Sequence, residues 1–93
     1  MRISQKTANQ ASEIIHAMFG PDAKIWLFGS RANDAERGGD VDIFVETISS
    51  DALKRIDCRA KLTDLFDLKV DLIIGGGDLP IHKIAKSTGV RLN

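Results

Sequence analysis

The spacing of apolar residues predicts three helices, at residues 4–19, about 51–66 and 80–87. In the first, apolar residues recur every three or four positions, at Ala8, Ala11, Ile14, Ile15 and Met18. In the second, the corresponding face carries Leu53, Ile56, Ala60, Thr63 and Phe66. Residues that favour helix ends agree with these limits: Gly20-Pro21 follows the first helix, Ser49-Ser50-Asp51 precedes the second, and Pro80 and Gly89 flank the third.

Three strands are predicted between these helices. Residues 25–28 form a short, continuous apolar run that is typical of a buried strand, and Gly29-Ser30 follows it as a tight turn. Residues 40–45 and 68–74 are also expected to be strands, in which successive side chains point to opposite faces. In the last strand Asp71 lies on the face opposite to its apolar neighbours, and a charged residue in so apolar a strand needs a reason.

The order helix, strand, strand, helix, strand, helix predicts one small α/β (α+β) domain over residues 1–93, a mixed sheet with helices packed on one face. A chain of 93 residues has room for one modest core. Three short strands leave a sheet edge available, so we expect a homo- or hetero-oligomer.

Composition narrows the range of functions. Thirteen basic residues balance thirteen acidic ones, so no global field attracts nucleic acid, and DNA binding is disfavoured. The single cysteine, Cys58, excludes an internal disulfide and a Cys-rich zinc site, which fits a reducing compartment, and we expect it to pack inside a helix. We also expect a cytoplasmic protein without membrane association, because no apolar stretch approaches the roughly 20 residues that span a bilayer.

The first candidate for chemistry is the pair Asp40 and Asp42, which share one face of the predicted strand. Two adjacent carboxylates repel each other unless a cation neutralises them. Without cysteine or histidine nearby, oxygen ligands select a hard ion, Mg²⁺ first and Mn²⁺ second. Such Asp-x-Asp pairs are also common on solvated strand faces, so this motif alone leaves both interpretations open.

The second candidate is Gly29-Ser30, just before that strand. Glycine permits close backbone approach, and a serine that starts a short helical turn offers a hydroxyl beside free N–H groups, which suits a phosphate. Arg31 follows directly, and its guanidinium could reach nucleotide phosphates. A phosphate cradle followed by metal-binding carboxylates is more specific than either motif alone.

With these motifs, LFGSRA and GGDVDIFVE, the chain resembles the DNA polymerase β-type nucleotidyltransferase superfamily, whose signature is Gly-Ser, a spacer and Asp-x-Asp. Within it, the chain looks like the minimal nucleotidyltransferases (MNT), the antitoxin partners of HEPN toxins. The resemblance implies a minimal palm-like core and a Mg²⁺-dependent enzyme with ATP as substrate. It makes Asp40, Asp42 and Asp71 the catalytic and metal-binding residues and Gly29, Ser30 and Arg31 the nucleotide-binding ones.

Three functions remain open on these grounds. The first is an active antitoxin that transfers AMP from ATP to a tyrosine hydroxyl of its cognate HEPN toxin. The second is an inactive antitoxin that neutralises the toxin by binding alone. The third is a nucleotidyltransferase subunit that acts on a small-molecule hydroxyl, as in an aminoglycoside. The intact Gly-Ser and three aspartates favour the first over the second.

Overall fold

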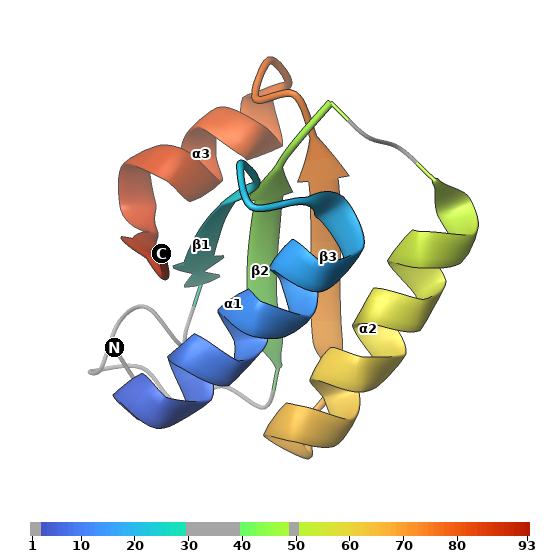
Figure 1. Cartoon of the computed structure of the whole chain (residues 1–93). Helices are drawn as coiled ribbons and strands as arrows, with labels where there is room; N and C mark the ends of the chain where they lie inside the picture. The colour runs from blue at the N-terminus through green and yellow to red at the C-terminus, as the bar shows by residue number, and fades with distance from the viewer. Residues whose placement is uncertain (1–2, 30–39, 49–50) are drawn as a thin grey trace.

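The computed structural model describes residues 3–29, 40–48 and 51–93, and these segments contain three helices and four strands (Figure 1). In chain order the elements are α1 (Gln5–Phe19), β1 (Lys24–Phe28), β2 (Val41–Glu46), α2 (Ala52–Phe66), β3 (Val70–Gly75), α3 (Pro80–Thr88) and β4 (Val90–Arg91). The predicted helices and the three predicted strands are therefore all present, with ends shifted by one or two residues. The helical turn predicted just after Gly29 lies outside the described residues.

The strands form one mixed sheet in the order β3-β2-β1-β4. β1 runs antiparallel to both β2 and β4, whereas β2 and β3 are parallel because α2 carries the chain back between them. The strand β4 was not predicted, since two residues are too few to show a pattern. It is held at the edge of β1 by pairing with Trp26 and Leu27 and by a 2.8 Å hydrogen bond from the Leu92 amide to the Ile25 carbonyl.

One face of the sheet packs against α1 and α2 and forms the main core. The stripe predicted for α1 is confirmed, because Ala8, Ala11 and Ile15 are buried and Ile14 and Met18 pack against them. Ser4 caps the helix by accepting a 3.1 Å hydrogen bond from the Thr7 amide. From the sheet this core receives the alternate residues of three strands: Ile25, Leu27, Val41, Ile43, Val45, Val70, Leu72 and Ile74.

The opposite face of the sheet is covered in part by α3. Trp26, Phe28 and Phe44 alternate with the residues of the main core and form a second cluster with Ala85 of α3. The prediction that the helices pack on one face therefore holds for α1 and α2 and is wrong for α3. The apolar run of β1 leaves large side chains on both faces of the sheet, so both faces need cover.

The stripe predicted for α2 holds only at its C-terminal end, where Phe66 packs against the core, and is wrong for the first half of the helix. Leu53 and Ile56 are 78% and 62% exposed, and the helix instead buries Cys58 and Leu62. The buried pair is four residues apart and faces the core, which rotates the predicted stripe toward solvent. Cys58 is packed inside as expected, and burial raises the pKa of its thiol to about 11.

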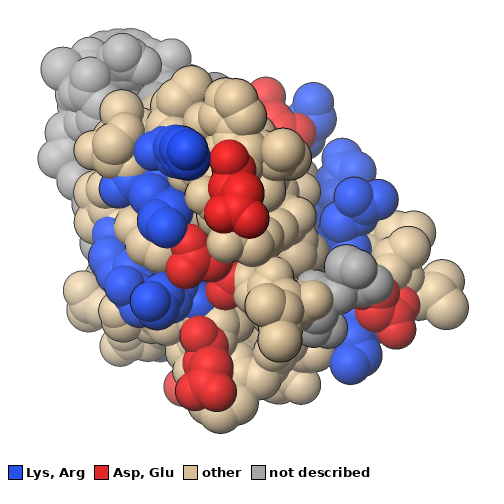
Figure 2. All heavy atoms as spheres, turned by 90° about the horizontal axis from the view of Figure 1, so that it is seen from above, with Lys and Arg blue, Asp and Glu red and all other residues tan. Residues whose placement is uncertain are grey.

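Charges of both signs lie on the surface. Figure 2 looks onto the end of the sheet at which β2 and β3 finish, and there Lys and Arg side chains lie among Asp and Glu side chains. This mixture agrees with the balance of thirteen basic and thirteen acidic residues. Within residues 3–29, 40–48 and 51–93, no helix has the length and apolar character needed to cross a membrane.

Candidate active site

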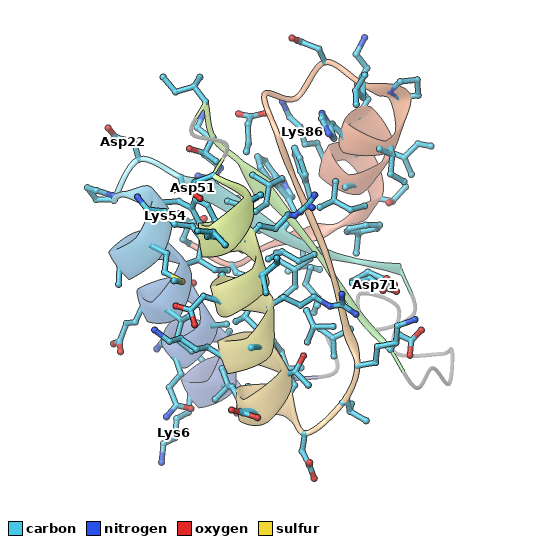
Figure 3. All side chains as sticks on the ribbon, turned by 90° about the vertical axis from the view of Figure 1, so that its right-hand side faces the viewer. Lys6, Asp22, Asp51, Lys54, Asp71 and Lys86 are labelled. Carbon is cyan, nitrogen blue, oxygen red and sulfur yellow. The ribbon has the colours of Figure 1, made fainter. Side chains whose placement is uncertain are left out.

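The parallel pairing of β2 with β3 brings together two of the predicted aspartates. Asp42 and Asp71 are direct partners in the register of the two strands, so their side chains stand next to each other on the same face. This is the face that α3 covers at Phe44. Asp42 is half-buried and the Asp71 side chain is 43% exposed, so the pair remains open to solvent. Figure 3 shows Asp71 on the side of β3 that faces away from α2.

The environment of Asp42 disfavours its ionised form. Its pKa is raised, first by burial, then by the negative charge of Asp71 and a side-chain hydrogen bond with it, and then by the charge of Asp40. Lys69 acts in the opposite direction. The three predicted carboxylates therefore interact through their charges, which is the electrostatic situation that a bound cation relieves.

Asp40 lies just before β2 begins and is exposed. Its negative charge is one of the causes that raise the pKa of Asp42. Asp40 is thus the outermost of the three carboxylates, and Asp42 and Asp71 form the inner pair.

Gly29 directly follows the last residue of β1 and lies beside Asp42. Its φ of +72° is one that L side chains rarely adopt, and a Cβ at this position would overlap Oδ2 of Asp42. Phe28, the residue before it, is the register partner of Asp42. Gly29 and the strand that carries Asp42 therefore meet at one point. Ser30 and Arg31, the other predicted nucleotide-binding residues, lie outside the described residues.

Lys69 belongs to the same cluster and was not predicted. Its Nζ lies 3.7 Å from Oδ1 of Asp71, in an ion pair whose two side chains are 61% and 43% exposed. The signal was present in the sequence, because residues two apart on a strand share a face. Lys69 therefore offsets part of the negative charge of the aspartate pair, weakly, as exposed ion pairs do.

Two other acidic residues are engaged elsewhere. Glu46, which shares the face of Asp42, forms a 2.6 Å ion pair with Lys86 of α3 at the far end of β2. Asp67, four residues before Asp71, ends α2 with a left-handed φ of 54° and donates its backbone N–H to the Thr63 carbonyl. Asp67 thus has a structural role as the cap of α2.

The donor set suits a hard divalent cation held jointly with a nucleotide. Among the described residues, no three His, Cys, Asp or Glu side chains are placed to hold a metal ion by themselves. Magnesium commonly takes only one or two protein carboxylates and completes its coordination with substrate phosphates and water. Asp42 and Asp71 supply those two carboxylates. The pKa of Asp42 is raised first by burial and then by the negative charges of Asp71 and Asp40, and a cation would offset these charges.

A search with protein-family models matches residues 8–89 to the polymerase β nucleotidyltransferase family. The chain belongs to this family. The match spans both Gly29 and all three aspartates, so the family assignment rests on the same segment as the site. No curated protein matches the chain significantly in sequence.

Solved structures of toxin–antitoxin complexes contain chains of the same fold. One, a toxin–antitoxin with AMP-PNP, is 23% identical with a TM-score of 0.76, over 92% of this chain and 72% of that chain. A chain of the MntA-HepT toxin–antitoxin is 22% identical with a TM-score of 0.73, over 97% and 72%. A chain in the complex of tri-AMPylated Shewanella oneidensis HEPN toxin with MNT antitoxin is 23% identical with a TM-score of 0.73, over 97% and 72%.

Proposed function

We propose that this nucleotidyltransferase is the antitoxin of a HEPN/MNT pair and transfers AMP from ATP to a tyrosine hydroxyl of its cognate toxin. The observation that carries the proposal is the pairing of Asp42 with Asp71 beside Gly29, on a sheet face that is open to solvent. Support comes from similar structures: one contains AMP-PNP and another contains an AMPylated HEPN toxin with an MNT antitoxin.

In the proposed reaction the acceptor hydroxyl oxygen attacks the α-phosphorus of ATP. A new O–P bond forms, the bond from the α-phosphorus to the bridging oxygen breaks, and pyrophosphate leaves. Asp71 accepts the hydroxyl proton, because its side chain is 43% exposed and an acceptor hydroxyl can reach it. Gly29 lets the triphosphate approach the backbone beside Asp42, and Ser30 and Arg31 bind the outer phosphates.

Asp40, Asp42 and Asp71 would hold Mg²⁺, or Mn²⁺ in its place, and the ion would supply positive charge that stabilises the transferring phosphoryl group. The chain's own contribution is to hold the two inner carboxylates in register on neighbouring strands, so that they are already in position before the nucleotide arrives.

The test begins with the reading frame next to this gene. A small helical HEPN protein with an Arg-x₄-His motif is expected there, and incubation with this chain, Mg²⁺ and labelled ATP should transfer AMP to a tyrosine of that protein. Mass spectrometry identifies the modified residue. Stable binding without any transfer would instead identify an antitoxin that works by binding alone. Transfer only to small hydroxyl compounds would identify the third function.

A second prediction concerns the metal. Mg²⁺ should bind weakly to the free protein and appreciably better in the presence of a non-hydrolysable ATP analogue, because the triphosphate supplies several of the oxygen ligands. Isothermal titration calorimetry measures both affinities. Asp42→Asn should remove the difference, whereas Asp64→Asn, an exposed aspartate of α2, should leave it unchanged. Nucleotide binding that is indifferent to metal in the wild-type protein would contradict the metal role of this face.

A further inference from the structure

The outer edge of β3, with which no other described strand pairs, carries backbone groups that can pair with another strand. Lys69 and Gly75 bond to β2, since their carbonyls accept from the Val41 and Thr47 amides at 2.9 and 3.0 Å. Because successive residues of a strand turn their backbone groups to opposite sides, Leu72 and Ile74 direct theirs away from β2. β3 stands at the end of the sheet order, so these groups face the outside of the sheet. An edge of this kind is a template for an extended segment of another chain.

A groove follows this edge beside α2, and its β3 residues come from both faces of the strand: Leu72 from the face that packs against α2, and Asp71 and Ile73 from the opposite face. Its walls come from both elements: Arg55, Ile56, Arg59, Asp71, Leu72 and Ile73. Arg59 is held in place by a 3.0 Å hydrogen bond from its Nε to the carbonyl of Val70, the first outward-facing carbonyl of β3. Figure 3 looks directly onto this side of the molecule, with α2 and β3 adjacent in front. The groove thus combines edge backbone groups with two guanidinium groups.

The charged and apolar residues of the groove indicate what kind of segment would bind there. Arg55 and Arg59 are four residues apart, so they lie on the same side of α2 and offer donors to carboxylates. Next to them, Ile56 is 62% exposed, and Leu53, one turn earlier in α2, is 78% exposed. Two large apolar side chains that are so exposed, close together on one helix, are typical of a surface that contacts a partner. The complementary segment is therefore extended and carries acidic side chains beside apolar ones.

The groove also reaches the candidate active site, because Asp71 is one of its walls. We propose that the partner protein docks here by adding an extended, acidic segment to the edge of β3. The carboxylates of this segment meet Arg55 and Arg59, and a hydroxyl-bearing side chain at its end stands at Asp71. The identity of the partner in this inference rests on the proposed function. The inference adds which surface the partner binds and how its acceptor hydroxyl reaches Asp71.

The test compares two charge reversals at neighbouring positions of α2. Arg55→Glu should weaken binding of the neighbour-encoded HEPN protein on the order of tenfold or more, because it places like charges against the acidic segment. Lys54→Glu makes the same change in charge at the adjacent exposed position, which does not line the groove, and should change the affinity by less than about threefold. Circular dichroism and the binding of an ATP analogue check that both variants fold.

Hydrogen exchange tests the mode of docking. The amides of Leu72 and Ile74 should exchange more slowly in the complex than in the free protein, as those of a newly paired strand do. A complex that Arg55→Glu does not weaken, or in which these two amides exchange unchanged, overturns the proposal, and so does the failure of the wild-type chain to bind. Concentration-dependent protection of the same amides in the free protein would assign the edge to a second copy, which also overturns it. AMP transfer is followed in the same samples, so binding at this edge without transfer supports the docking surface while refuting the proposed catalysis.

Discussion

Asp42→Asn and Asp71→Asn are each expected to reduce AMP transfer to the toxin by about a thousandfold or more, and the double variant should be hardly worse than either. The two carboxylates are register partners on neighbouring strands, and each serves the other by holding the same cation and nucleotide. Removing one leaves the other without its function, so the losses do not add. The measurement is the initial rate of transfer of labelled AMP at saturating ATP.

Asp67→Asn is the matched control for these variants. It makes the same chemical change four residues before Asp71, at an exposed position that caps α2 with a left-handed backbone, which asparagine tolerates. Transfer should remain within about twofold of wild type, as expected for a surface substitution away from the site. Full activity in Asp71→Asn together with loss in Asp67→Asn would show that the third carboxylate has been assigned to the wrong residue.

The loss of activity in Asp42→Asn should not reflect unfolding. Burial and the charges of Asp71 and Asp40 raise the pKa of Asp42 in the folded protein, so its ionised form opposes folding at neutral pH. That cost is present above the raised pKa and disappears as the pH falls below the ordinary carboxyl range. Asp42→Asn should therefore be at least as stable as wild type at pH 7, with an advantage that shrinks on acidification, as thermal melts at both pH values would show.

The inner part of the site was predictable because its residues lie in local motifs. Asp42 and Asp71 each stand on a strand that alternates, and Gly29 ends the strand before them, so short-range periodicity was enough to propose them. Their contact depends on the parallel register of β2 and β3, which no local pattern specifies. The ion pair of Lys69 with Asp71 could have been predicted from their spacing, because the two residues share a face of the strand. That Lys69 also acts on Asp42 follows only from the pairing of β2 with β3.

Elements whose faces are decided by packing were harder to predict. The helix α2 carries two competing apolar stripes, one with Leu53 and Ile56 and the other with Cys58 and Leu62. Only the position of the helix against α1 and β3 decides which of the two is buried. In α3 the buried residues are His82 and Ala85, and neither residue type indicates from the sequence which face of the helix packs against the sheet. The short strand β4 exists because β1 offers an edge, and its own two residues carry no signal.

His82 had no predicted role, and it organises the connection between β3 and α3. Its ring stacks on Phe44, with centroids 4.7 Å apart and planes at 17°, and it is only 4% exposed. Its Nδ1 accepts hydrogen bonds from the amides of Gly77 and Leu79, at 3.2 and 3.3 Å. The second of these bonds resembles the reciprocal half of a capping box, because His82 is the third residue of α3 and Leu79 is its N-cap. Histidine thus fixes the start of the helix that covers Phe44.

Gly75→Ala is expected to destabilise the protein by about 2–4 kcal/mol, because it disturbs this arrangement. A Cβ at residue 75 would overlap Cε1 of His82 and lie 2.6 Å from its Nε2, so the ring must move away from Phe44 and give up both backbone hydrogen bonds. For a chain of this length the melting temperature should fall by roughly 10 °C or more. Gly76→Ala is the control, since beyond its chain neighbours the nearest atom of the described residues to the added Cβ is Oδ2 of Asp78 at 4.0 Å. The stability of this variant should change by less than about 0.5 kcal/mol.

A double-mutant cycle with His82→Ala separates this contact from a general effect of alanine in the strand. His82→Ala alone should also be destabilising, because the amides of Gly77 and Leu79 lose their acceptor and Phe44 loses its stacking partner. In that background the ring is absent, so the further cost of Gly75→Ala should fall to about 1 kcal/mol or less. If Gly75→Ala costs as much without the ring as with it, the strain lies in the backbone of β3, and His82 is not the reason that residue 75 is glycine.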